Sequence, residues 1–172
     1  MPLIKYFFEI IQQRRYVVNI VLVSPKIPQN TGTIGRSCVS VGARLHIIKP
    51  IPFEIDEKKV RRAGLDYWQD LDLIVWESLD EFLKSNPINE RHFFATTKTE
   101  KLYFNISFKE GDFIYFGSED SGLPLELMQK REEGMITIPM KKEYRSLNQS
   151  NAVSIILFEA IRQNIEAFKE LA

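Results

Sequence analysis

The sequence has one cysteine, Cys38, and two histidines among its 172 residues. A single cysteine cannot form a disulfide within the chain, and we expect a protein of the reducing cytoplasm. One thiol and two dispersed histidines are too few for a closed zinc site, so we expect no bound metal. His46 and His92 both fall inside or at the start of apolar runs, where a structural histidine is more common than a catalytic base.

Long apolar runs and several familiar motifs are also missing. No run approaches the roughly 18 residues that a membrane-spanning helix needs. The first 18 residues have too short an apolar run, and the wrong charge order, for a signal peptide. The chain has no GxxxxGK[ST] loop, no GxGxxG after its first strand and no GxSxG elbow. These absences argue against a membrane protein, a P-loop enzyme and a serine hydrolase.

The sequence has no excess charge of either sign. Its 23 Lys and Arg balance 23 Asp and Glu, and the pI is about 6.8. Nucleic-acid binders are often basic, so a large nucleic-acid footprint is disfavoured. Two short basic clusters remain, each either a solvated face or a local nucleic-acid contact: Lys58, Lys59, Arg61 and Arg62, and then Lys141, Lys142 and Arg145.

What the sequence does contain is a regular alternation of apolar strands and helices. Strands are predicted at 17–24, 43–50, 71–76, 91–98, 111–118 and 135–140. Helices are predicted at 31–41, 56–65, 79–86 and from about Asn151, the first with Asn30 or Thr31 as cap and Gly42 as terminator. The pattern predicts one α/β domain over residues 16–172, with a mostly parallel sheet and helices on both faces. Residues 1–15 are expected to be an N-terminal extension without assigned function.

The last predicted helix is apolar on two sides. One stripe is continuous, and Ile155 and Phe158 lie on a second side. The sheet can cover only one of these sides, and a second copy of the chain would cover the other. A homodimer is therefore expected. The residues of the main stripe are Val153, Ile156, Leu157, Ala160 and Ile161.

Four polar segments are predicted to meet at the carboxyl ends of the strands, where open α/β sheets bind ligands. They are PQNTGTIGR (28–36), ATTK (95–98), GSEDSGLP (117–124) and the stretch from Ile138 to Asn151. Each also has a structural interpretation. Gly117 is explained as a turn glycine, Glu119 as a carboxylate favouring the following helix, Asn148 as a cap, and Arg36 as part of a surface ion pair.

Three of these segments, in this order, resemble a known family. NTGTIGR (30–36), YFGSEDSGLP (115–124) and ITIPMKKEYRSLNQSNAVSI (136–155) are similar to the three motifs of the SPOUT-class RNA 2′-O-methyltransferases. The segments IPQNTGTIGR, LHIIKP and RRAGLDYW also resemble the small family that methylates the wobble nucleotide of tRNA. The similarity extends from about Val18 to Gln163.

The resemblance implies a C-terminal trefoil knot, S-adenosylmethionine bound in that knot, and an obligate homodimer. The implied reaction is methyl transfer to the ribose 2′-OH of tRNA nucleotide 34, a cytidine or modified uridine in the anticodon stem-loop. Two alternatives stay open: a ribosomal RNA 2′-O-methyltransferase, and an inactive RNA-binding protein with the same fold.

The resemblance also implies roles for particular residues. Arg36 would lie beside the ribose and its phosphate, as the base or as the group that makes the hydroxyl more acidic. Because an arginine side chain stays protonated, we favour a cation that stabilises the developing oxyanion. Asn30 would hold the same loop, and Glu119 would pair with Arg36. The remaining substrate-side residues are Ser146 and Asn148, where cofactor and ribose meet, and Arg145 on the RNA side.

The resemblance implies that the cofactor is held mainly by backbone groups and apolar walls. At Gly117 a side chain is expected to obstruct the approach of backbone to ligand. The family often has Tyr where this chain has Phe158, so any hydroxyl contact there is lost. The implied cofactor-binding residues are Ala95, Thr96, Gly117, Ile138, Met140, Ser146 and Leu147.

Overall fold

The computed structural model describes residues 18–55, 68–141 and 143–168. Four sequence predictions fall outside this part of the chain: the N-terminal extension, the helix at 56–65, the first basic cluster, and Lys142. The remaining elements can be compared directly with the sequence.

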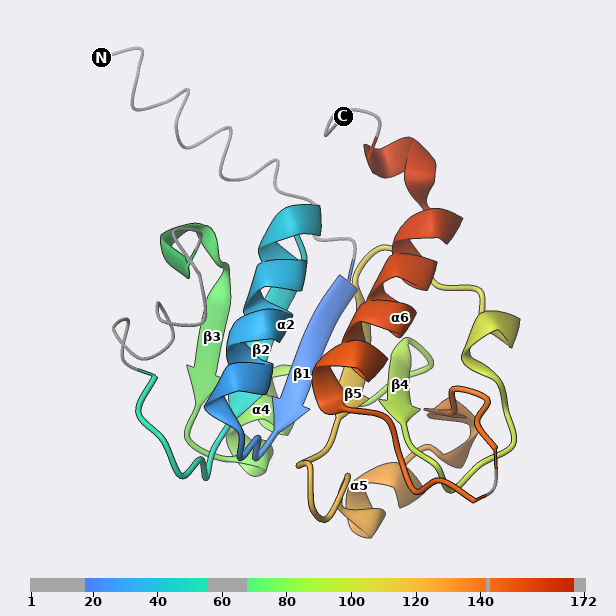
Figure 1. Cartoon of the computed structure of the whole chain (residues 1–172), viewed down its shortest axis with the longest axis horizontal. Helices are drawn as coiled ribbons and strands as arrows, with labels where there is room; N and C mark the ends of the chain where they lie inside the picture. Colours follow the sequence, from blue (N-terminus) through green and yellow to red (C-terminus); the bar gives the residue numbers. More distant parts are fainter. Residues whose placement is uncertain (1–17, 56–67, 142, 169–172) are drawn as a thin grey trace.

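Six strands form one sheet in which every pairing among the described residues is parallel. The sheet order is β3-β2-β1-β5-β4-β6, with β1 at its centre (Figure 1). The predicted parallel sheet is confirmed. The strands are β1 (Val18–Val23), β2 (Arg44–Ile48), β3 (Leu73–Trp76), β4 (His92–Ala95), β5 (Asp112–Phe116) and β6 (Met135–Ile136).

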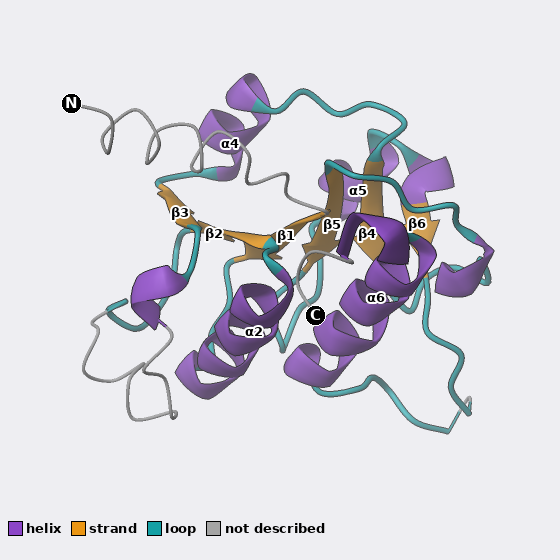
Figure 2. Ribbon diagram, turned by 90° about the horizontal axis from the view of Figure 1, so that it is seen from above, coloured by secondary structure: helices purple, strands orange, loops and turns teal. Residues whose placement is uncertain are grey.

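Helices cover both faces of the sheet, as predicted (Figure 2). Helices α2 (Pro28–Val41) and α6 (Gln149–Gln163) lie on one face, and α4 (Leu79–Ser85) and α5 (Leu125–Gln129) lie on the other. Short 3-10 turns connect these elements: η1 (Trp68–Asp70), η2 (Tyr103–Asn105), η3 (Glu132–Gly134) and η4 (Ile165–Phe168).

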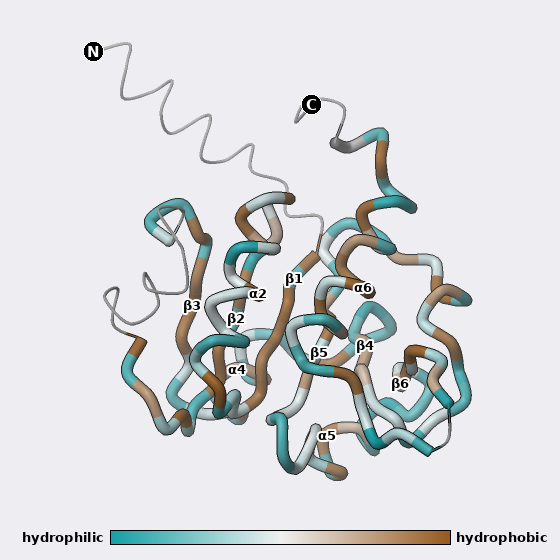
Figure 3. Tube along the Cα trace, in the orientation of Figure 1, coloured by the Kyte–Doolittle hydropathy of each residue, from teal (hydrophilic) through white to brown (hydrophobic). Residues whose placement is uncertain are grey.

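The central strand β1 divides the interior into two cores. All six of its residues are buried, which explains its continuous apolar sequence and its brown colour in Figure 3. Ile20 and Leu22 belong to the core under α2 and α6, whereas Val21 and Val23 belong to the core under α4 and α5. Alternate side chains of one strand therefore anchor helices on opposite faces.

Two predicted boundaries were wrong. The strand expected at 135–140 ends at Ile136, and Thr137 makes only an isolated bridge to Leu102. Pro139 lacks an N–H group and cannot donate to a continued ladder. Helix α2 begins at Pro28, earlier than predicted, so Asn30 lies inside the helix and does not cap it.

The predicted C-terminus of α2 and the predicted N-terminal cap of α6 are confirmed. Gly42 terminates α2 in the left-handed conformation, with φ of 68°, as its position predicted. Asn148 caps α6, which confirms the structural interpretation of this residue.

Candidate active site at the carboxyl ends of the strands

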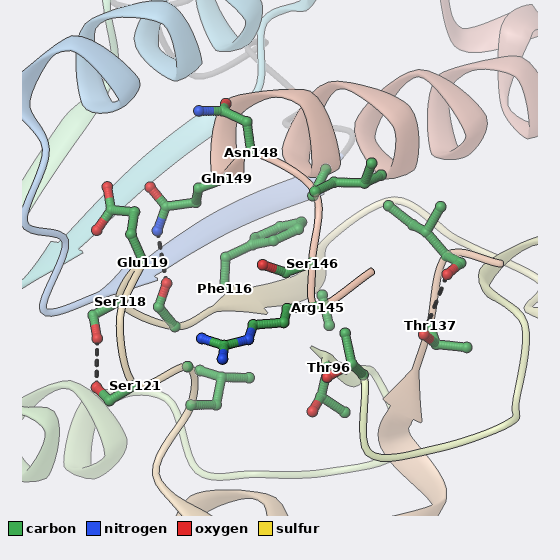
Figure 4. A pocket seen from close by; sticks show the side chains of 18 of the residues that line it. Thr96, Phe116, Ser118, Glu119, Ser121, Thr137, Arg145, Ser146, Asn148 and Gln149 are labelled. Atoms are coloured by element: carbon green, nitrogen blue, oxygen red, sulfur yellow. Dashed lines mark hydrogen bonds between the residues drawn. The ribbon is translucent and has the colours of Figure 1, made fainter. Parts of the chain in front are cut away.

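A cavity of about 750 Å³ opens at the carboxyl ends of β4, β5 and β6, beside the first turn of α6 (Figure 4). Its volume suits a ligand of cofactor size. The structure brings eleven of the twelve predicted site residues into the wall of this cavity, and Arg36 is the exception. The eleven are Asn30, Ala95, Thr96, Gly117, Glu119, Ile138, Met140, Arg145, Ser146, Leu147 and Asn148.

Glu119 joins the loop after β5 to the start of α2. Its Oε2 accepts a hydrogen bond from the backbone N–H of Lys26 at 2.8 Å, and its Oε1 accepts from the N–H of Ile27 at 3.2 Å. Oε1 also accepts from the Asn30 side-chain amide at 2.9 Å. The carboxylate thus acts as a distant cap for α2, and the pairing with Arg36 that the resemblance suggested stays a prediction.

Asn148 joins α6 to α2. Its Nδ2 donates to Asn30 Oδ1 at 3.0 Å, and its Oδ1 accepts from the Ser150 N–H at 2.9 Å. The same oxygen accepts from the Ser150 hydroxyl at 2.6 Å and from the Asn151 N–H at 3.4 Å. Because both ends of the Asn148 side chain are used within the protein, its geometry favours positioning of the cavity wall over direct contact with substrate.

Gly117 is required by the protein's own backbone. A Cβ added there would lie 1.9 Å from the Gly122 carbonyl carbon and 2.1 Å from the Leu123 nitrogen. The turn is closed by the Gly122 N–H, which donates to the Ser118 carbonyl at 2.8 Å, and Gly122 has a φ of 71°. The clash is within the turn, so the protein's own backbone requires this glycine, and the expected obstruction of a ligand stays a prediction.

The rim of the cavity carries charges of both signs. Asp120 is exposed and pairs with Lys26, while its Oδ1 accepts from the Ser118 hydroxyl at 2.8 Å. The Lys26 ammonium and then the Ser118 hydroxyl hold the pKa of Asp120 well below its ordinary value. Asp120 is therefore ionised at neutral pH.

The two predicted RNA-binding arginines lie at different places. The Arg145 side chain extends into the cavity (Figure 4) and is exposed. Arg36 is also exposed, on α2, but does not line the cavity. The structure therefore separates the two cations that the resemblance assigns to RNA.

Sequence reasoning missed Gln149. This residue opens α6, is only 8% exposed, and lines the cavity. Its Nε2 donates to the Gly117 carbonyl at 2.7 Å, whereas no described group donates to its Oε1. Its place next to the capping Asn148, at the carboxyl ends of the strands, was the available signal.

The two histidines lie outside the cavity and are buried in β2 and β4. His46 bonds to Asn19 at 3.2 Å and accepts from the Trp76 indole N–H at 3.1 Å, and His92 bonds to the Tyr115 hydroxyl at 2.7 Å. Burial lowers the pKa of each histidine to about 4. Both are neutral at pH 7, in agreement with the structural interpretation.

Two features are absent from the described ranges. No cluster of three or more His, Cys, Asp or Glu side chains there is arranged to hold a metal ion. Within the same ranges, no helix combines the length and the apolar character that crossing a membrane requires.

Residues 17–158 match the model of the family described as the SpoU rRNA Methylase family. The chain belongs to the SpoU methylase family. This SpoU methylase is 44% identical over 149 residues to the tRNA (cytidine(34)-2′-O)-methyltransferase of Escherichia coli K12, covering 86% of this chain and 94% of the relative. It is 43% identical over 146 residues to the enzyme of the same name from Saccharophagus degradans, covering 84% and 94% of the two chains.

Solved structures agree with this family membership. A structure described as "Structural insights into the 2-OH methylation of C/U34 on tRNA" superposes with a TM-score of 0.81 at 38% identity, covering 87% of this chain and 97% of that chain. The AviRb methyltransferase of Streptomyces viridochromogenes gives a TM-score of 0.74 at 23% identity, with coverage of 86% and 57%. The second likeness shows the fold alone.

Proposed function

We propose that this SpoU methylase transfers a methyl group from S-adenosylmethionine to the ribose 2′-OH of nucleotide 34, the wobble nucleotide, of tRNA. One observation carries the proposal. The cavity that contains the family's second and third motifs is joined by Glu119, Asn30 and Asn148 to helix α2, which carries the first. Relatives that cover almost all of this fold are named for this reaction.

The cavity fits the proposed cofactor by size and by wall chemistry. Apolar side chains such as Ile138 and Met140 provide surfaces for a flat heterocycle and a thioether chain. Polar groups at Thr96 and Ser146 provide hydrogen-bond partners on the same walls. S-Adenosylmethionine, when bound, supplies an electrophilic methyl group. We propose that the residues that hold it are Ala95, Thr96, Gly117, Ile138, Met140, Ser146 and Leu147.

The protein's own task in this reaction is positioning and charge stabilisation. An in-line displacement needs the attacking oxygen held close to the methyl carbon, and such positioning lowers a barrier without covalent chemistry. Arg36 would stabilise negative charge on the ribose oxygen as it loses its proton, and would grip the neighbouring phosphate. Ser146 would lie where ribose and cofactor meet, with Arg145 on the RNA side.

The nucleotide specificity is tested with purified protein, labelled S-adenosylmethionine and separate RNA substrates. We expect 2′-O-methylated nucleoside at position 34 in tRNA and none in ribosomal RNA. Absence of the product from every RNA, with the cofactor bound, would contradict the proposal and support an inactive RNA-binding protein. Product in ribosomal RNA alone would show that the proposed substrate is wrong and the proposed reaction is right. Nucleoside mass spectrometry of tRNA from cells lacking the protein tests the same point in vivo.

We further propose that the protein works as a homodimer through α6, and that the C-terminal segment forms the trefoil knot of the resemblance. Two large apolar side chains on α6 support the dimer: Ile155 is 37% exposed and Phe158 is 48% exposed. Apolar side chains at these exposures beside each other favour a protein–protein contact.

The dimer is tested by light scattering after size-exclusion chromatography. We expect Phe158→Glu to give a monomer, because a charge in an apolar interface is left unpaired. Leu125→Glu is the control, since Leu125 is 55% exposed on α5, on the opposite face of the sheet. A Phe158→Glu variant with the same mass as the wild type would contradict the dimer proposal.

A further inference from the structure

One buried acceptor in the cavity wall has no partner. Among the described residues, only two buried side-chain atoms lack a hydrogen bond, Thr31 Oγ1 and Gln149 Oε1, and only Gln149 lines the cavity. A buried amide oxygen that has lost water and gained no donor is costly, and native proteins rarely keep one without a reason.

The orientation of the Gln149 amide is set by its surroundings. The Gly117 carbonyl, 2.7 Å away, can only accept a hydrogen bond, so the nitrogen must face it and the oxygen must face away. Figure 4 shows Gln149 projecting from the start of α6 toward the loop that carries Ser118 and Glu119. A flipped amide would place two acceptors against each other and would not rescue the oxygen.

We propose that Gln149 is a further cofactor-binding residue: its Oε1 accepts a hydrogen bond from an N–H or O–H group of the bound cofactor, while its Nε2 holds the Gly117 carbonyl in the wall. The inference rests on the proposed function. S-Adenosylmethionine carries suitable donors in its ammonium group, its ribose hydroxyls and its adenine amine. The sequence resemblance assigned the cofactor to backbone groups, and Gln149 adds a side chain.

A second glutamine on the same helix provides a matched control. Gln163 also anchors α6 to a loop carbonyl, because its Nε2 donates to Ile106 O at 2.9 Å. Unlike Gln149, it has a satisfied oxygen, which accepts from the Phe108 N–H at 2.8 Å, and it does not line the cavity. The two residues share a chemical type and an anchoring role, and they differ in the orphaned oxygen.

The test is calorimetric titration of S-adenosylhomocysteine, without RNA, into wild type, Gln149→Leu and Gln163→Leu, alongside thermal denaturation of each free protein. We expect Gln149→Leu to bind about tenfold more weakly, the effect of losing one good hydrogen bond. Its melting temperature should fall less than that of Gln163→Leu, because the leucine also removes an unsatisfied acceptor. Gln163→Leu should bind the ligand as the wild type does.

A Gln149→Glu variant sharpens the test. A protonated glutamic acid reproduces the donor and acceptor of glutamine, whereas the carboxylate places a second acceptor against the Gly117 carbonyl. We therefore expect its affinity to approach that of the wild type at about pH 5 and to fall as the pH rises to 8, while wild-type affinity changes little.

The outcomes separate the two proposals. Wild-type affinity for S-adenosylhomocysteine in Gln149→Leu would overturn the role of Gln149 and leave the proposed function intact. Absence of ligand binding by the wild type itself would instead contradict the proposed function.

Discussion

Helices α2 and α6 lie side by side on one face of the sheet and both begin at the candidate active site, but their first turns are capped in different ways (Figure 2). Helix α6 is capped locally, by Asn148 at its own N-cap position. Helix α2 has Ile27 at its N-cap, without a side-chain cap, and its acceptor is Glu119, 92 residues along the chain.

The two caps differ in which parts of the chain they hold together. A local cap stabilises its helix wherever that helix is placed. A distant cap also fixes the helix against the loop that provides it, so the start of α2 can form its hydrogen bonds only when the loop after β5 is in place. Through Asn30, the two caps are joined into one network. The helix that carries Arg36 is thereby tied to the cavity wall.

The largest expected effect tests whether α2 contributes to chemistry and α6 to cofactor binding. Arg36→Ala should lower methyl transfer at least about 100-fold, because it removes a cation placed to stabilise developing charge. Its affinity for S-adenosylhomocysteine should stay close to that of the wild type, since Arg36 does not line the cavity. Steady-state kinetics and calorimetry measure the two quantities.

The control for Arg36 is Lys84→Ala, which removes an exposed cation from α4 on the opposite face of the sheet and should leave both quantities unchanged. If Arg36→Ala lost cofactor affinity as well, the division of roles between the two helices would be wrong.

The next largest effect is expected from a substitution that disrupts the distant cap of α2. In Glu119→Gln an amide replaces one of the oxygens that accept from Lys26, Ile27 and Asn30, so at least one donor is left opposite another donor. We expect a loss of about 2 kcal/mol in the free energy of unfolding, at the upper end of the values for lost helix caps. Thermal or urea denaturation measures it.

Asp120→Asn is the matched control for the distant cap, because its ion pair with Lys26 is exposed and should contribute little. Equal losses of unfolding free energy in the two variants would show that the α2 cap contributes no more than an exposed ion pair.

The local cap should be weaker but separable. Asn148→Ala removes the acceptor for the Ser150 and Asn151 N–H groups, and we expect it to cost about 1 kcal/mol in the free energy of unfolding. Asn148→Asp keeps that acceptor and loses only the donor to Asn30, so it should be the more stable of the two variants. Denaturation curves compare them, and the reverse order would mean that repulsion between the new carboxylate and Asn30 Oδ1 outweighs the cap.

The same contrast explains what the sequence could predict. Capping by Asn148 depends on the residues that follow it, and it was recognised. The sequence pattern predicts Asn30 or Thr31 as the cap of α2, because a local pattern contains no information about a residue far along the chain. Glu119 was interpreted as favouring the helix that follows it, whereas it serves one that precedes it. Only the parallel order of β1 and β5 brings the two segments together.

Other features of the site also divide into those that the sequence predicts and those that depend on the folded structure. The four polar segments could be placed at one edge of the sheet because motifs that end neighbouring parallel strands must meet. The family resemblance assigned the individual residues, and eleven of them line the cavity. The backbone clash that requires Gly117 could not be predicted, because it depends on how tightly the Gly122 turn folds back. Gln149 could not be found for a similar reason. A glutamine after a helix cap is common, and the sequence reveals neither its burial nor the missing hydrogen-bond partner of its Oε1.

The smallest effect is the coupling between the two caps, and a double-mutant cycle measures it. Asn148→Asp removes the donor to Asn30 Oδ1, and Asn30→Ala removes the acceptor. If the hydrogen bond joins the helix starts, Asn148→Asp should cost less in the Asn30→Ala background than in the wild type, by about 0.5–1 kcal/mol. Additive effects would mean that α2 and α6 are capped independently. The network would then be two separate caps that happen to lie in contact, and the position of Arg36 would depend on Glu119 alone.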